Sequence, residues 1–140
     1  MKAIGYVKDI CTSTGEVITK EEQKEKIIQY AKLNNVNLIG ILEEDDSIPE
    51  AILDRAEVKK ILQMAGEIDT VIVERVWCFS RKYGEVVTCL DELYKIGIKI
   101  VSALTMWDCT SQKVRHYYYK RKDEQIELNL PMNKVYKKGA

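Results

Sequence analysis

Cationic and hydroxyl side chains gather in or beside three polar segments of this 140-residue sequence, at residues 8–18, 43–54 and 77–84. A group of cations beside hydroxyls suits an anionic substrate, and a phosphodiester is the obvious candidate because fixed positive charges stabilise phosphoryl chemistry. The residues that could do this chemistry are Lys8, Thr12, Ser13, Arg55, Ser80, Arg81 and Lys82.

Several other kinds of site find no support in the sequence. Neither GxGxxG nor GxxxxGK[ST] occurs, which argues against a nucleotide-binding loop. The single histidine is His116, and the four cysteines form no CxxC pair, so no zinc-ligand cluster is indicated. We therefore expect no metal and no cofactor. The four cysteines are scattered along the chain, as is typical of reduced thiols in a cytosolic protein. They are Cys11, Cys78, Cys89 and Cys109.

The polar segments follow apolar runs that alternate with helical patterns. Strands are predicted at 2–7, 36–42, 70–76 and 98–104, and helices at 19–33, 55–65 and 85–96. The first helix opens on a capping box formed by Thr19 and Glu22, and Gly66 and Gly97 end the other two. Residues 8–18 are predicted to form a loop.

Four strands separated by helices imply right-handed crossovers and a doubly wound, mainly parallel α/β sheet. In such a sheet ligands bind beyond the carboxyl ends of the strands. The three polar segments therefore converge at one edge, and we expect any active site in the loop after the first strand.

The C-terminal part of the chain differs in charge from the rest. Residues 1–112 carry 14 basic and 19 acidic side chains, a net charge of −5, whereas residues 113–140 carry 8 basic and 3 acidic ones, a net charge of +5. This asymmetry fits either a tail that binds polyanions such as DNA or a solvated tail. Tyr117–Tyr119 could pack on the sheet, and Ile126–Leu130 could form an extra edge strand.

The length of the chain indicates one domain, which we place at residues 1–112. The basic extension at 113–140 is too short for a helix-turn-helix module, so we expect no separate DNA-binding domain. No apolar run is long enough to span a membrane, and no signal-peptide core is present. We expect a cytoplasmic protein.

Five sequence segments resemble, in order and spacing, the catalytic domain of the serine recombinases, the resolvase/invertase family. The resemblance covers roughly residues 3–112. The segments are AIGYVK at 3–8, TKEEQ at 19–23, the Asp46-to-Arg55 spacing, DTVIVERVWCFSR at 69–81 and GIKIVSALTMWDCTS at 97–111.

The resemblance implies a metal-free DNA strand exchange without a cofactor. In the family, a serine after the first strand attacks the DNA phosphate and forms a phosphoserine link, and arginines stabilise the transition state. It also implies DNA as a partner, together with a second copy or another recombinase.

Matched position by position, this sequence departs from the family at its catalytic residues. Ile10 stands where the nucleophilic serine is expected, and Trp77 and Cys78 replace an aspartate and an arginine. Loss of one transition-state donor typically costs about 10²–10³ in rate, so loss of several together with the nucleophile predicts an inactive domain. The residues still suited to DNA phosphates are Lys8, in place of an arginine, Arg55 and Arg81.

The sequence leaves three functions open. The first is a catalytically inactive resolvase-like domain, associated with recombination or a mobile element, that acts by binding DNA or protein. The second is an active small recombinase in which Ser13, or else Thr12 or Cys11, takes the nucleophile's place. The third is an unrelated regulatory α/β phosphate-binding protein, since fold alone does not fix function.

Overall fold

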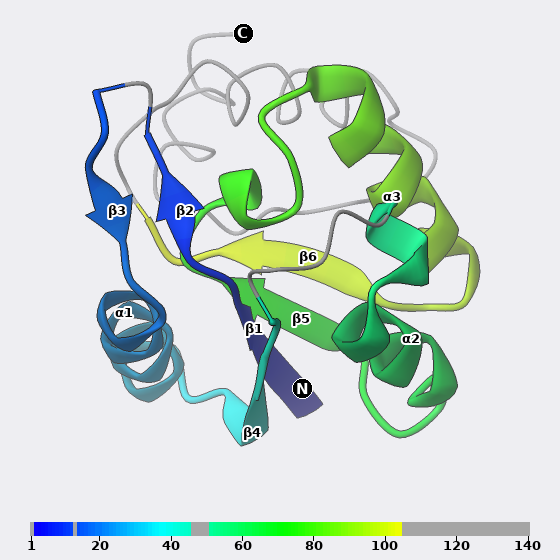
Figure 1. Ribbon diagram of the computed structural model, residues 1–140. Coiled ribbons are helices and arrows are strands. Elements are labelled where there is room, and N and C mark those ends of the chain that lie inside the picture. The colour runs from blue at the N-terminus through cyan, green and yellow to red at the C-terminus, as the bar shows by residue number, and fades with distance from the viewer. Residues whose placement is uncertain (1, 13, 46–50, 105–140) are drawn as a thin grey trace, which may run out of the picture.

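A four-stranded parallel sheet forms the centre of the computed structural model, which describes residues 2–12, 14–45 and 51–104. Its strands lie in the order β4-β1-β5-β6, all parallel to their neighbours (Figure 1). This arrangement confirms the predicted parallel α/β sheet. The strands are β1 (Lys2–Val7), β4 (Asn37–Glu43), β5 (Thr70–Val73) and β6 (Lys99–Ser102).

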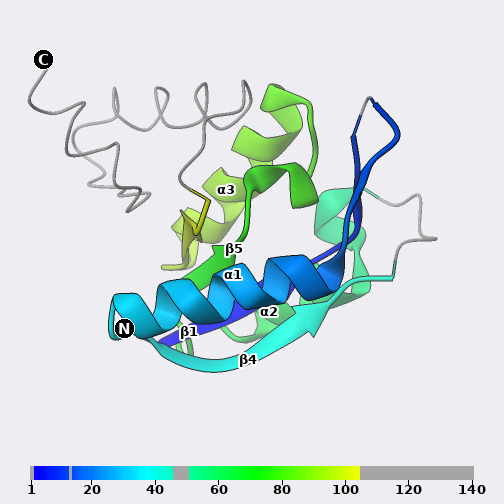
Figure 2. The same cartoon turned by 90° about the vertical axis from the view of Figure 1, so that its left-hand side faces the viewer.

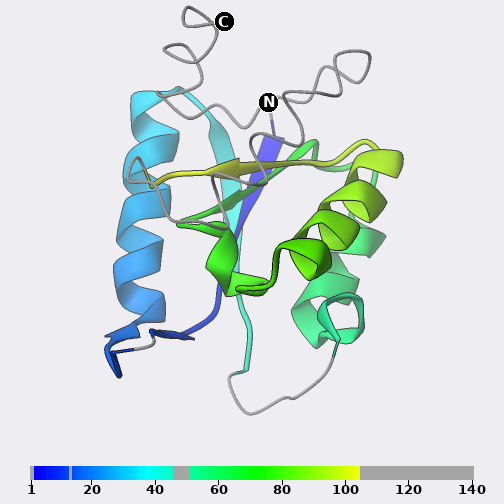
Figure 3. The same ribbon diagram turned by 90° about the horizontal axis from the view of Figure 1, so that it is seen from above.

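Helices cover both faces of the sheet. Helix α1 (Lys20–Leu33) lies on one face, and α2 (Ala56–Gln63) and α3 (Tyr83–Lys95) lie on the other (Figure 3). The Thr19 side chain accepts a hydrogen bond of 3.2 Å from the amide of Glu22, as the predicted capping box requires. None of the helices in the described part of the chain is long and apolar enough to cross a membrane.

The segment after β1 is a correction to the sequence prediction, because part of it is a hairpin rather than a loop. Strands β2 (Ile10–Cys11) and β3 (Val17–Ile18) pair antiparallel, and the hairpin projects beyond the sheet (Figure 2). Thr12 closes its turn through backbone bonds with Glu16 and Gly15 and through its hydroxyl, which accepts from the Glu16 amide at 3.1 Å. The strands are two residues long, too short for an alternating pattern to mark them.

Other boundaries move by a few residues. Strand β5 ends at Val73 rather than at residue 76, because a 3₁₀ turn, η2 (Val76–Cys78), follows it closely. A second such turn, η1 (Ile52–Asp54), precedes α2. Gly66 and Gly97 have φ angles of +89° and +85°, a conformation that favours glycine after a helix.

The core lies in two layers that hold the carboxyl ends of the strands in place. The larger apolar cluster packs between the sheet and α2 and α3, and the smaller one lies under α1. The predicted edge strand at 126–130 and the extension at 113–140 lie outside the described residues.

Candidate functional site

The site predicted from the sequence lies at the carboxyl ends of β1 and β5, the two central strands. From β1 the chain continues into β4 on one side, and it then crosses to β5 on the other. Neighbouring loops therefore leave these two strand ends in opposite directions. Open α/β sheets usually bind ligands at such a point, beyond the carboxyl ends of the strands. The first residues beyond β1 lead into the β2–β3 hairpin, and those beyond β5 lead into η2.

Packed apolar side chains fill this position. Ile10 is only 4% exposed and belongs to the larger core cluster, together with Tyr6, Cys78 and Phe79. The rings of Tyr6 and Phe79 are stacked, with centroids 5.2 Å apart and planes 11° from parallel. The residue at the expected nucleophile position is thus part of the core, and its hydrocarbon side chain has no group that could attack a phosphate.

Arg55 makes a set of hydrogen bonds inside the protein. Its Nη1 donates to the carbonyl oxygen of Cys78 at 2.9 Å and to the hydroxyl of Tyr6 at 3.2 Å, and its Nη2 donates to the carbonyl oxygen of Phe79 at 2.7 Å. Its Nε is buried and has no hydrogen-bond partner among the described residues. The guanidinium group therefore joins the start of α2 to the end of η2, satisfying carbonyl groups that the short helix leaves unpaired.

A buried carboxylate completes this network. The Tyr6 hydroxyl donates to Oε1 of Glu44 at 3.0 Å, and Oε2 accepts from the amide of Glu57 in the first turn of α2 at 3.4 Å. Glu44 is 1% exposed. Burial raises the pKa of Tyr6 far above its ordinary value, so the hydroxyl remains protonated and acts as a donor. Three elements distant in sequence are thereby held together by the side chains of Tyr6, Glu44 and Arg55.

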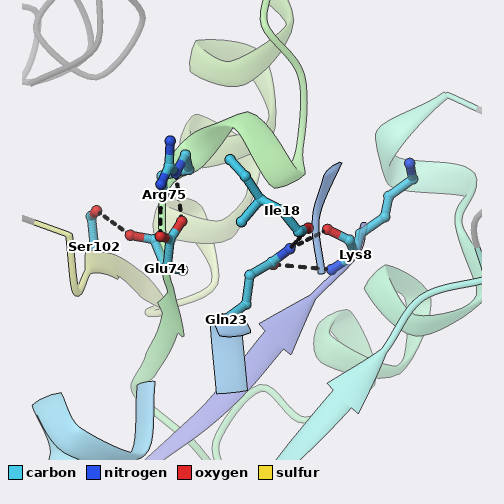
Figure 4. A network of polar contacts seen from close by, with 6 residues as sticks. All are labelled: Lys8, Ile18, Gln23, Glu74, Arg75 and Ser102. Carbon is cyan, nitrogen blue, oxygen red and sulfur yellow. Dashed lines mark hydrogen bonds and ion pairs between the residues drawn. The ribbon is translucent and has the colours of Figure 1, made fainter. Parts of the chain in front are cut away.

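A second network fixes the hairpin to α1 (Figure 4). Gln23 is fully buried, and its Nε2 donates to the carbonyl oxygens of Lys8 at 2.6 Å and Ile18 at 2.9 Å. Its Oε1 accepts from the Lys8 amide at 3.3 Å. Only the backbone of Lys8 takes part, and its side chain extends away from Gln23. The position of Lys8 is therefore fixed while its ammonium group is left out of this network.

Two arginines lie against Trp77, the residue at the position where the resemblance implies an aspartate. The guanidinium carbon of Arg81 lies 4.2 Å from the centroid of the indole ring, and that of Arg75 lies 5.7 Å away. Arg75 also makes a two-point ion pair with the buried Glu74, at 2.5 and 2.8 Å, and the Ser102 hydroxyl donates to the Glu74 carbonyl at 3.0 Å (Figure 4). Cation–π contacts thus hold Trp77 beside Arg81, which is exposed.

The cysteines of the described region differ in environment. Burial raises the pKa of Cys89 to about 12 and raises the pKa of Cys78 further. Cys11 is exposed on the hairpin. Within the described ranges, no three His, Cys, Asp or Glu side chains gather as a metal site.

The structure brings two of the site residues predicted from the sequence to the same segment. Arg55 and Arg81 both contact the segment after β5, Arg55 through carbonyl oxygens and Arg81 through the Trp77 ring. Ser13 lies outside the described residues, and the neighbouring Thr12 closes the hairpin turn. Sequence reasoning did not single out Tyr6, Glu44 or Gln23, because most of their contacts join residues 13 to 49 positions apart.

Three solved structures show how widely this fold is shared. The N-terminal catalytic domain of TP901-1 integrase is 19% identical, with 89% of this chain and 97% of that chain covered and a TM-score of 0.61. A resolvase family site-specific recombinase from Streptococcus pneumoniae is 16% identical, with coverages of 89% and 88% and a TM-score of 0.61. The C-terminal catalytic domain of ISC1926 TnpA, an IS607-like serine recombinase, is 14% identical, with coverages of 87% and 80% and a TM-score of 0.59.

At these identities the solved structures establish the fold alone. No curated protein matches the chain significantly. The sequence model of the family described as "Resolvase, N terminal domain" matches residues 7–118, which is most of the chain. This match shows that the chain belongs to the resolvase N-terminal domain family.

Proposed function

We propose that this chain is a resolvase-like domain that no longer cleaves DNA and instead acts by binding it. The observation that carries the proposal is the burial of Ile10 in the core at the position where the family carries its nucleophile. A buried hydrocarbon cannot form a phosphoester. Family membership also argues against the third function left open by the sequence, an unrelated phosphate-binding protein.

The arrangement around Arg55 supports the same proposal. A transition-state arginine needs free N–H groups that face the reacting phosphate. Three of the five N–H groups of Arg55 instead donate to protein oxygens, and the unpaired Nε is buried. In this proposal Arg55 keeps its place in the fold and supports the segment that carries Arg81, rather than stabilising a reaction.

Lys8 and Arg81 are the residues we propose for DNA phosphate contacts. They follow the two central strands, and neither side chain is buried. Lysine and arginine at such positions attract the phosphate backbone without reading sequence, so binding should be non-specific and should weaken as salt rises. The basic residues at 113–140 would add to the same attraction.

Fluorescence anisotropy with a labelled DNA duplex, measured over a series of salt concentrations, tests this function. Lys8→Ala and Arg81→Ala should each weaken binding and each reduce the salt slope by about one unit, as expected when one phosphate contact is lost. Lys95→Ala is the control, since Lys95 is exposed in the last turn of α3 and lies away from the carboxyl ends of the strands.

The results separate the alternatives clearly. An unchanged salt slope in both variants would show that Lys8 and Arg81 make no phosphate contacts. If the full chain does not bind even at the lowest salt, the DNA-binding role is wrong. An active enzyme that uses Ser13 is a separate alternative, which a covalent protein–DNA product would reveal.

A further inference from the structure

The two aromatic residues of the segment that follows β5 differ in their surroundings. Phe79 is 1% exposed inside the core, whereas Trp77 is half-buried and packs against the core. The indole Nε1 of Trp77 is buried and has no hydrogen-bond partner among the described residues. Because a buried N–H without a partner costs stability, a phenylalanine or a leucine would fill this place at a lower cost. Packing alone therefore does not account for the indole ring.

The indole ring instead holds an arginine at the protein surface. Tryptophan is the best cation–π partner among the aromatic residues. The guanidinium carbon of Arg81 lies over the Trp77 ring, 4.2 Å from its centroid, which is direct contact. Arg81 is an exposed residue, so it lies on the solvent side of the half-buried ring. The stacked pair therefore presents the planar guanidinium group to the solvent.

The backbone that carries this pair is held in place on both sides. Arg55 donates hydrogen bonds to the carbonyl oxygens of the two residues that follow Trp77. The Ser80 hydroxyl, next to Arg81, donates to the carboxylate of Glu85 in the first turn of α3 at 2.7 Å. A surface that is ordered before binding loses little conformational entropy when a ligand binds, which favours affinity.

The charge of Lys8 acts on the same segment from the end of β1. Burial raises the pKa of the Cys78 thiol, and the positive charges of Arg55 and Lys8 oppose that rise. The ammonium group of Lys8 is therefore close enough for its charge to act at Cys78, the neighbour of Trp77. A DNA backbone bound by Lys8 and Arg81 would pass beside the stacked pair.

This combination of cations with a planar surface suits a DNA strand whose bases are unpaired. In a duplex the faces of the bases are stacked on one another, and only their edges are accessible in the grooves. Unpaired bases can stack on aromatic rings and on guanidinium planes, and such stacking tolerates any sequence because every base has a π-face.

We propose that Arg81, held on the Trp77 ring, is a stacking platform for an unpaired base, so that the chain prefers single-stranded DNA to a duplex. The inference rests on the proposed DNA-binding function and names the form of DNA that the site takes. In this arrangement the face of the guanidinium group contacts the base, while the N–H groups at its edge remain directed at phosphates.

Fluorescence anisotropy with three labelled probes of equal length tests the inference: a thymine single strand, an abasic single strand and a duplex. The abasic strand keeps the sugars and phosphates but has no bases to stack. The full chain should bind the thymine strand about tenfold more tightly than the abasic strand, and more tightly than the duplex.

Arg81→Lys is the decisive variant, because it keeps the charge and removes the planar group on an exposed side chain. It should reduce the tenfold preference for the thymine strand over the abasic strand to about twofold or less. Arg75→Lys is the matched control: Arg75 is 5.7 Å from the same ring but is held by its ion pair with Glu74, so the preference should be retained.

Variants of Trp77 test its positioning role. Trp77→Leu removes the ring that holds Arg81 and should reduce the preference in the same way as Arg81→Lys. Trp77→Phe keeps a ring and should retain most of the preference, which a role in packing alone would not require. Circular dichroism checks that these variants fold, and Arg81→Lys carries the test if Trp77→Leu does not.

Photo-cross-linking locates the base directly. A single strand with iodouracil in place of thymine is irradiated in complex with the full chain, and the product is digested with trypsin. Trypsin cleaves after Arg75, so the cross-link should be found by mass spectrometry in a peptide that begins at Val76 and contains Trp77.

The outcomes separate this inference from the proposed function. If none of the three probes binds, DNA binding itself is wrong and the inference fails with it. If the chain binds DNA, the inference alone is overturned by any of three results. These are a thymine strand that binds no more tightly than the abasic strand or the duplex, an Arg81→Lys variant that retains the preference, and a cross-link that is absent from the Trp77 peptide.

Discussion

Three hydrogen bonds from the Arg55 guanidinium hold the start of α2 against the segment that follows β5. Arg55→Met keeps most of the length of the side chain but leaves the carbonyl groups of Cys78 and Phe79 without this donor. Because hydrogen bonds to a charged group are worth about 1.5–3 kcal/mol, the free energy of unfolding should fall by about 2–3 kcal/mol in urea denaturation.

The matched control for that change is Lys59→Met, one turn further along α2 on its exposed side. An exposed substitution of this kind should change the free energy of unfolding by no more than about 0.5 kcal/mol. Equal effects of the two substitutions would show that the hydrogen bonds of Arg55 contribute nothing specific to the fold.

Thiol chemistry provides a second prediction for single residues. Burial raises the pKa of Cys89 to about 12 and that of Cys78 further, so both thiols stay protonated through the neutral range and are shielded from reagents. In the folded protein, iodoacetamide should modify Cys11 before the two buried cysteines, and Cys78 and Cys89 should react at least about 100-fold more slowly than Cys11.

Peptide mapping by mass spectrometry measures the three rates. Because the pKa of each buried thiol is raised, an increase to about pH 9 should leave its thiolate scarce and its modification slow. The difference should vanish in denaturant. Rapid labelling of Cys89 in the folded chain would contradict the buried environment described for α3.

At the scale of elements, much of the fold could be predicted from the sequence. The four strands are short apolar runs and the three helices have apolar residues at helical spacing, and Thr19 marks the start of α1 because its cap is a local interaction. The β2–β3 hairpin could not be found in this way. A two-residue strand has no period, although a turn containing Thr12 and Gly15 between Ile10 and Ile18 was an available signal.

The candidate site was harder to predict for a physical reason. The resemblance gave the positions of Ile10, Arg55 and Arg81, but it could not show what these side chains contact. The contact of Arg55 with Phe79 joins residues 24 positions apart and depends on how α2 packs beside η2. Such tertiary contacts decide whether a matching arginine faces a ligand or the protein itself.

The docking of the hairpin onto α1 depends on one buried amide. Gln23→Leu removes the two donors and one acceptor that bind the backbone of Lys8 and Ile18, and it leaves these groups unsatisfied in a buried place. We expect a loss of about 2–4 kcal/mol in the free energy of unfolding, together with faster hydrogen exchange at the hairpin amides.

Gln29→Leu is the control for this change, since Gln29 is an exposed residue of the same helix. It should leave both the free energy of unfolding and hairpin exchange nearly unchanged. If Gln23→Leu behaved in the same way, the hairpin would have to be held by its apolar contacts alone.

At the scale of the whole molecule, the chain combines a family fold with a central position that packed side chains fill. The parallel sheet and its flanking helices are those of serine recombinase catalytic domains. The space at the ends of β1 and β5, however, is packed by Ile10 and by the stacked rings of Tyr6 and Phe79. We expect this packing to stabilise the fold at the expense of the reaction.

The most direct test is to incubate the full chain with DNA and look for a covalent protein–DNA product after denaturation. A phosphoserine link would survive denaturing electrophoresis, and cleaved DNA would accompany it. We predict neither product, for the unmodified chain and for Ser13→Ala alike. A covalent product that Ser13→Ala abolishes would contradict the proposed loss of catalysis and would identify this chain as an active recombinase with a displaced nucleophile.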